Sequence, residues 1–203
     1  MKSEILKKSG EIFLKFGFKS TTMDDIANKM AISKKTIYKY FKNKEQLVKE
    51  SVSFFHNTIH NEVISVCGRG YNAIEENFEI KKMFKDLLQN SSESPMFQLQ
   101  KYYPETYKNV MKNEFTMFRD CISQNIEKGI SEKLYRENLD VNLITKLYFT
   151  LVFGIHDANL FPLENKTLNQ LEIDALEYHT RAIATKKGIE MLEEQLEKNK
   201  SQL

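Results

Sequence analysis

The chain of 203 residues has no tryptophan, three prolines, seven glycines and two cysteines. Glycine and proline build the tight turns between strands, and no Asn-Gly or Asp-Gly pair separates alternating apolar runs, so β structure has little support. The cysteines, Cys67 and Cys121, suit a reduced intracellular protein; a structural disulfide is the other interpretation.

Long apolar runs are also missing. No stretch of roughly 18 uninterrupted apolar residues exists, and the N-terminal MKSEILKKSGEIF lacks the continuous apolar region of a secretory signal. We therefore expect a cytoplasmic protein with no membrane segment. The sequence also has no Gly-rich phosphate loop, no Gly-x-Ser-x-Gly elbow and no Cys-x-x-Cys pair, so we predict no catalytic residue, no enzyme activity and no cofactor.

Charge is distributed unevenly along the chain. Residues 1–50 hold 12 lysines against 6 acidic residues, a net charge of +6, and the remainder carries −4, so the whole chain is only +2. A positive N-terminal part is expected when a polyanion binds at one end of a protein. Lysine-rich helix surfaces are commonly just solvated, so this charge matters only where a motif coincides with it.

Such a motif lies in residues 21–47, TTMDDIANKMAISKKTIYKYFKNKEQL. Two short apolar-striped segments, 23–30 and 34–41, are joined by the three residues 31–33. The second segment interleaves lysines with threonine and tyrosine. This arrangement is typical of a helix-turn-helix whose second helix meets phosphates and base edges in a DNA major groove.

The ends of these segments carry helix-capping signals. Thr22 and Asp25 have the spacing of a capping box, Ser33 is a natural N-cap, and Asn43 with Gln46 repeats the capping-box spacing before a further helix. The buried stripe of the first segment is expected at Ile26, Ala27 and Met30. In the second segment Ile37 and Phe41 should face the core, which turns the lysines and Tyr38 outward or to the flanks.

Residues 4–50 resemble the DNA-binding domain of the TetR family of bacterial transcriptional regulators. The residues that match the family pattern are Thr21, Thr22, Ile26, Ala27, Ile32, Ser33, Lys34, Thr36, Ile37, Tyr38, Tyr40, Phe41, Asn43, Lys44, Glu45 and Leu47. The departure is Lys35, where many members have glycine. Beyond residue 50 only length and helical character are similar.

The resemblance implies an all-α chain, with an N-terminal three-helix helix-turn-helix domain at 1–46 and a helical effector-binding and dimerisation domain at 47–203. It implies DNA contacts from Thr22, Ser33, Lys34, Lys35, Thr36, Tyr38, Lys39, Tyr40 and Lys44. Phosphate contacts are expected from Thr22 and Lys44, and base contacts from the lysines and Thr36 of the third helix. The other interpretation is an exposed lysine-rich helix of an ordinary bundle.

Apolar stripes predict the remaining helices at about 3–16, 44–66, 71–89, 96–103, from Pro104 onward, 141–160, 167–184 and 189–196. The helices at 141–160 and 167–184 most resemble the family's dimer interface. A homodimer that binds a palindromic double-stranded operator follows from the resemblance, because one domain contacts only a short half-site.

Aromatic side chains are abundant after residue 80. The candidates for an apolar or aromatic effector site are Phe84, Phe97, Tyr102, Tyr103, Phe115, Phe118, Tyr148, Phe153 and His156. At helical spacing such residues more often form ordinary core, so the ligand site follows from the resemblance. His56 and His60 have metal-ligand spacing but no evident third ligand, so no metal is predicted. His179 is interpreted as a packing or hydrogen-bonding residue.

The expected function is sequence-specific regulation of transcription, as a repressor that a small molecule releases. Two alternatives stay open. One is a helical small-molecule carrier or enzyme with a basic N-terminal bundle. The other is a ligand-independent architectural or adaptor protein that uses the basic domain on DNA.

Overall fold

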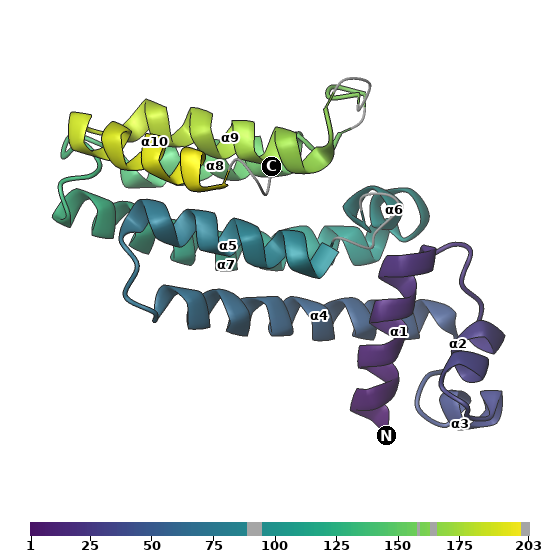
Figure 1. The fold of residues 1–203 in the computed structure, drawn as a ribbon. Helices are drawn as coiled ribbons and strands as arrows, with labels where there is room; N and C mark the ends of the chain where they lie inside the picture. The colour runs from purple at the N-terminus through teal and green to yellow at the C-terminus, as the bar shows by residue number, and fades with distance from the viewer. Residues whose placement is uncertain (89–94, 158, 163–165, 200–203) are drawn as a thin grey trace. The chain divides into compact units, whose positions relative to one another are not determined.

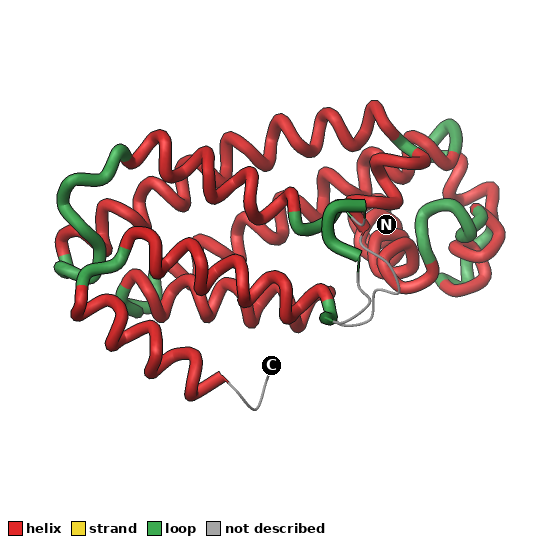
Figure 2. The backbone as a smooth tube through the Cα atoms, turned by 90° about the horizontal axis from the view of Figure 1, so that it is seen from above, coloured by secondary structure: helices red, strands yellow, loops and turns green. Residues whose placement is uncertain are grey.

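The computed structural model describes residues 1–88, 95–157, 159–162 and 166–199. Within them the chain is helical and contains no strand, as predicted (Figures 1 and 2). An isolated antiparallel bridge joins Tyr135 and Ala184. The helices are α1 (Lys2–Phe16), α2 (Met23–Lys29), α3 (Lys34–Tyr38), α4 (Lys44–Cys67), α5 (Ala73–Leu88), α6 (Pro95–Tyr102), α7 (Pro104–Ser131), α8 (Val141–Gly154), α9 (Leu168–Ile183) and α10 (Lys186–Asn199).

The chain forms two compact units, and each of them combines two separate segments of the sequence. Unit 1 consists of Met1–Asn61 and Leu87–Glu114, and unit 2 of Glu62–Asp86 and Phe115–Leu203. The helices α4 and α7 therefore contribute residues to both. The boundary predicted at residue 46 separates a DNA-binding part from an effector-binding part. It concerns function, whereas these units are defined by compactness, so the boundary stays a prediction.

Unit 1 packs around an apolar core. Ile26 of α2, Ile37 of α3 and Phe41 just after α3 are fully buried, as their helical spacing predicts. Gly10 lets α1 approach α4 closely, because a Cβ there would lie 2.5 Å from the Phe55 ring. This core packs against the inner sides of the three N-terminal helices and holds them in place.

Residues from α6 and α7 complete unit 1. Gln98 Oε1 accepts a hydrogen bond of 2.8 Å from the main-chain N–H of Phe18, in the loop after α1. The Phe18 ring stacks on Phe13 and meets Tyr103 edge-on at 6.4 Å. Gly17 begins this loop at a φ of 88°, a left-handed conformation that glycine adopts without strain. The loop that leads into α2 is thus held by residues about 80 positions later in the chain.

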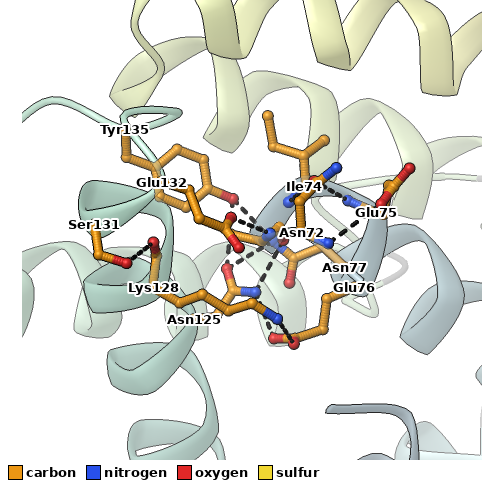
Figure 3. Close-up of polar contacts among 11 residues, drawn as sticks. Asn72, Ile74, Glu75, Glu76, Asn77, Asn125, Lys128, Ser131, Glu132 and Tyr135 are labelled. Carbon is orange, nitrogen blue, oxygen red and sulfur yellow. Dashed lines mark hydrogen bonds and ion pairs between the residues drawn. The ribbon is translucent and has the colours of Figure 1, made fainter. Parts of the chain in front are cut away.

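Unit 2 buries polar groups as well as apolar ones (Figure 3). Asn125 of α7 donates to Glu76 Oε1 at 2.7 Å and to the Ala73 carbonyl at 2.9 Å, and its own oxygen accepts from Asn77 at 3.0 Å. Lys128 Nζ lies 2.7 Å from the other Glu76 oxygen. The buried Glu76 carboxylate is therefore paired and hydrogen-bonded, which is what a buried charge requires.

Several helix ends differ from the predictions. The third helix was expected to run to Phe41 but ends at Tyr38, and Tyr40 N–H turns back to the Ile37 carbonyl. Gln46 N–H does bond Asn43, but the Gln46 side chain reaches the amide of Lys42 instead of completing a capping box.

The helix expected at 141–160 ends at Gly154. There the main-chain N–H groups of His156 and Asp157 donate to carbonyls three residues earlier instead of four. This tighter turn ends the α-helix. By contrast α10 is longer than the predicted 189–196. The Thr185 hydroxyl accepts a bond from the Gly188 N–H at 3.2 Å, which starts the helix earlier.

Both cysteines are free thiols, and burial raises the pKa of Cys67 to about 11. Among the described residues, no helix combines the length and the apolar character needed to cross a bilayer.

Candidate nucleic-acid interface

The first helix of the motif starts at a complete capping box. Thr22 Oγ1 accepts from the Asp25 N–H at 3.1 Å, and the Thr22 N–H donates to Asp25 Oδ2 at 2.8 Å, as predicted. The Thr22 hydroxyl also donates to Asp25 Oδ2 at 2.7 Å, and this bond together with the one from the Thr22 N–H lowers the pKa of Asp25 below its usual value. Ala31, in the turn between α2 and α3, has a φ of 53°, a left-handed conformation in which alanine is strained. The backbone of this turn therefore departs from the helical conformation of α2 and α3 at Ala31.

The next helix, α3, is capped by Ser33. Its hydroxyl accepts from the Thr36 N–H at 3.1 Å and lies 2.8 Å from the Thr36 hydroxyl, so both predicted DNA residues also shape the helix end. Ile37 and Phe41 are fully buried. Because these two anchors point inward, the opposite side of α3 faces outward.

That outward side carries tyrosines and lysines. Tyr38 and Tyr40 are 45% and 39% exposed, far more than aromatic residues of the core. Lys34, Lys35 and Lys39 are exposed as well. We call Lys34, Lys35, Tyr38, Lys39 and Tyr40 the recognition face. Its side chains can donate hydrogen bonds to phosphates and base edges and can offer apolar ring area to a thymine methyl.

Lys44, in the first turn of α4, has a partner that the sequence did not reveal. Its ammonium donates to the main-chain carbonyl of Lys19 at 3.0 Å, and burial lowers its pKa. A cation at a helix N-terminus is unfavourable for the helix dipole. The protein itself supplies a carbonyl oxygen to this cation, and the phosphate contact of Lys44 stays a prediction.

The predicted ligand residues lie in both units. Phe97, Tyr102 and Tyr103 belong to unit 1. There the Tyr103 hydroxyl donates to the Phe18 carbonyl at 3.4 Å, and the ammonium of Lys19 lies 4.9 Å from the centre of the Tyr102 ring. Phe84, Phe115, Phe118, Tyr148, Phe153 and His156 belong to unit 2. Within unit 1, the two tyrosines thus contact the loop before α2.

In unit 2 the rings of α7 and α8 form an aromatic cluster. Phe118 lies 5.5 Å from Tyr148 and 6.2 Å from Phe153, measured between ring centres. Phe149 contacts Phe115, Phe118 and Phe153 but was not among the predicted residues. Its position four residues before Phe153 on one helix could have identified it. Phe84 has no ring contact to this cluster among those that the structure describes.

Polar groups stand beside these rings: His156 and His179, which the sequence singled out, and Lys81 and Glu172, which it did not. The Tyr148 ring stacks on His179 at 3.7 Å, and burial lowers the pKa of His179 to about 4. Lys81 of α5 bonds Glu172 of α9, and His156 Nε2 lies 3.6 Å from the same carboxylate. Burial lowers the pKa of Lys81 and of His156, while Glu172 opposes both shifts.

A surface hollow of about 430 Å³ in unit 2 contains none of the predicted ligand residues. It is lined by Lys133, Tyr135, Arg136, Glu137, Asn138 and Thr185. The ligand prediction therefore depends on the aromatic cluster and its polar neighbours, and this hollow does not add to it.

Comparisons with known proteins agree with the motif. Residues 5–51 match the model of the bacterial regulatory proteins of the TetR family. The uncharacterized HTH-type transcriptional regulator YhgD of Bacillus subtilis is 25% identical over 82% of this chain and 90% of its own length. The HTH-type transcriptional repressor KstR2 of Mycolicibacterium smegmatis is 24% identical over 70% of this chain and 71% of its own length.

The fold also matches solved structures. One is the complex of SmeT with triclosan, in which 91% of this chain aligns with 92% of the other at a TM-score of 0.64 and 15% sequence identity. SmeT is the repressor of the Stenotrophomonas maltophilia multidrug efflux pump SmeDEF. At this identity the match establishes a shared fold.

Proposed function

We propose that this chain, which belongs to the TetR family of bacterial transcriptional regulators, is a repressor that binds a palindromic operator as a homodimer and leaves it when a small apolar or aromatic molecule binds. The observation that carries the DNA function is the recognition face. Exposed tyrosines and lysines stand on α3 and on the two residues after it, while Ile37 and Phe41 on the other side are fully buried. Transcription takes place at the chromosome, so the proposed site of action is the cytoplasm.

The proposed DNA residues have two roles: those outside the recognition face position the protein, and those of the recognition face contact bases and backbone. Thr22 and Lys44 lie at helix ends, where contacts to phosphates fix the register of a protein on DNA. Ser33 and Thr36 shape the start of α3. The ammonium groups of Lys34, Lys35 and Lys39 favour guanine O6 and N7 in the major groove, and Tyr38 and Tyr40 can contact backbone or a thymine methyl.

Dimerisation is proposed through α8 and α9. Leu143 and Leu147, four residues apart on α8, are 51% and 56% exposed, and Tyr178 of α9 is 71% exposed. Large apolar side chains that recur on one helix face and remain exposed mark an interaction surface. Two copies of this helix pair would bury these side chains in a four-helix bundle across a two-fold axis.

The effector is proposed to bind at the aromatic cluster of unit 2. Phe118, Tyr148 and Phe153 offer apolar ring surface, and His156 beside the Lys81–Glu172 pair offers a polar end. Ligand sites combine such apolar walls with a few polar groups that orient the ligand. The triclosan complex of SmeT, a protein of the same fold, supports a small-molecule effector.

Release from DNA is proposed to depend on spacing. Two half-sites one helical turn apart require a fixed distance between the two recognition helices of the dimer. A ligand that binds one arrangement of the helices better shifts the population toward it, by no more than its difference in affinity. Helix α4, which contributes to both units, is the proposed link between effector and recognition face.

The proposal is tested by selecting bound duplexes from a random DNA pool with the full chain. A recovered palindrome would support sequence-specific binding by a dimer at once. Recovery of unrelated sequences with equal affinity would contradict it and favour the alternative of a helical carrier or enzyme. The specificity ratio between the selected duplex and a scrambled duplex of equal length decides, because salt dependence alone reports phosphate contacts.

A further inference from the structure

One lysine of the recognition face is paired within the protein. Lys34, the first residue of α3, donates from its ammonium to Asp24 Oδ2 at 2.7 Å. Asp24 lies in the first turn of α2, ten residues earlier. Both side chains are exposed, at 45% and 63%. The carboxylate therefore stands at the surface that is proposed to meet DNA.

The pairing distinguishes Lys34 from its neighbours. Lys35 and Lys39 have no carboxylate partner among the residues that the structure describes. The hydrogen bond with Asp24 raises the pKa of Lys34, which keeps the ammonium charged. An ammonium has three N–H donors, and Asp24 takes one of them. Two donors remain for a base or a phosphate.

Asp24 is not needed to build the motif. The N-terminus of α2 is capped by Thr22 and Asp25, and α3 is capped by Ser33. An acidic residue in a first turn is favoured by the helix dipole, but that effect is small at an exposed position. Removal of the Asp24 charge should therefore leave the fold intact.

The pair has opposite consequences for two kinds of DNA binding. Non-specific binding depends on lysines that neutralise phosphates, and a carboxylate 2.7 Å from Lys34 cancels its charge and repels the phosphate. Specific binding depends on donors aimed at base edges, and a lysine held by one hydrogen bond is already ordered for that contact. The exposed pair is weak enough not to block such a contact.

We propose that Asp24 is a specificity-determining residue that restrains Lys34 from phosphates and orients it toward a guanine edge of the operator. This inference rests on the proposed DNA-binding function. It predicts that loss of the Asp24 charge strengthens binding to unrelated DNA and leaves operator binding unchanged or weaker.

The test compares the selected operator with a scrambled duplex of equal length, at several salt concentrations. The full-length proteins are the wild type, Asp24→Asn, Lys34→Met, the double variant and Glu11→Gln. The last removes a carboxylate from the exposed Lys8–Glu11 pair, at 2.9 Å on α1, and so matches the change in charge. Thermal unfolding confirms that each variant is folded.

For Asp24→Asn we expect scrambled DNA to bind the dimer about ten- to twentyfold more tightly, the effect of one exposed ion pair in each of its two subunits. Its affinity should fall more steeply with salt, by about 1.8 in the log–log slope for one additional phosphate contact in each subunit. Operator affinity should rise less than twofold or fall, so the specificity ratio drops by about the same factor. In the Lys34→Met background Asp24→Asn should have no effect, and Glu11→Gln should leave the ratio unchanged.

Three results would overturn the inference alone: an unchanged ratio for Asp24→Asn, the same change without Lys34, or an equal change for Glu11→Gln. Each would show that Asp24 is a solvated charge with no influence on specificity through Lys34. A wild type that binds operator and scrambled DNA equally would instead overturn the proposed function, and the inference with it.

Discussion

The two compact units differ in whether they bury charged side chains and tyrosines. In the described part of unit 1 no charged side chain is fully buried, and the tyrosines of the recognition face stand in solvent above Ile37 and Phe41. In unit 2 the Glu76 carboxylate is 4% exposed and Tyr135 is 1% exposed, and both are hydrogen-bonded inside the protein. The recognition face of unit 1 therefore combines exposed cations with exposed tyrosine rings, whereas the Glu76 charge of unit 2 is held inside the protein.

The difference has an energetic basis. The core of unit 1 is stabilised mainly by apolar burial. The free energy of this burial is proportional to the buried area and does not depend on the orientation of the groups. The network of unit 2 is directional, because each buried donor or acceptor needs its own partner. Unit 1 is thus suited to hold a surface rigidly, and unit 2 to distinguish between helix arrangements that do or do not satisfy its polar groups.

The largest effect is expected from Phe41→Ala, which removes the anchor beneath α3. A fully buried phenylalanine replaced by alanine costs about 3–5 kcal/mol of unfolding free energy, because a cavity remains. Denaturant unfolding measures this loss, and operator binding should fall with it. Phe16→Ala on α1 is the control, since Phe16 is 45% exposed and should cost less than about 1 kcal/mol. Similar losses for the two variants would refute the packing described for unit 1.

Asn125→Leu tests the polar network of unit 2. The leucine removes the donor to Glu76 and the acceptor for Asn77 while the volume stays similar. We expect a loss of about 3 kcal/mol, since a buried carboxylate loses a hydrogen bond. Gln124→Leu, at the exposed neighbouring position of α7, should change stability by less than about 0.5 kcal/mol. If Asn125→Leu were neutral, the network would not contribute to stability.

Acid should destabilise unit 2 through His179. Its pKa is about 4 in the folded protein and 6.5 ordinarily, so between these values only the unfolded chain takes up the proton. Stability is therefore constant above pH 6.5 from this group and falls between pH 6.5 and 4, by at most about 3 kcal/mol. His179→Phe keeps a ring against Tyr148 and should flatten this decline. An acid limb that is the same in both proteins would exclude His179 as its source.

The smallest effect is expected from Thr22→Ala at the start of α2. The variant loses the hydroxyl that accepts from the Asp25 N–H, which costs about 1 kcal/mol. Thr22→Ser keeps the hydroxyl and should be close to the wild type in stability and in operator affinity. Equal stability of the alanine and serine variants would mean that the capping box does not stabilise unit 1.

The sequence predicted unit 1 in more detail than unit 2. Capping at Thr22 and Ser33 and burial of Ile37 and Phe41 depend on neighbours within a few residues, and these local predictions are confirmed. The bond between Gln98 and Phe18 joins residues 80 positions apart, which no local pattern encodes.

The same reason explains what was missed elsewhere. The carbonyl partner of Lys44 at Lys19 lies 25 residues away, so no local pattern predicted this hydrogen bond. Lys81 and Glu172 are 91 residues apart and gave no signal as a pair. Phe149 is different, because its spacing of four residues from Phe153 on one helix is a local pattern that predicts their contact. The DNA and ligand roles of all these residues stay predictions.

The most direct test of the recognition face is the affinity of Tyr38→Ala for the selected operator, measured by fluorescence anisotropy beside Phe16→Ala and the wild type. Tyr38 and Phe16 are equally exposed, at 45%, so loss of ring area at the surface is matched. Loss of one contact in each half-site should weaken operator binding by the Tyr38→Ala dimer by about 100-fold or more, while its thermal unfolding stays as in the wild type. Phe16→Ala should bind within about twofold of the wild type. A folded Tyr38→Ala protein with unchanged operator affinity would contradict the assignment of this face to DNA.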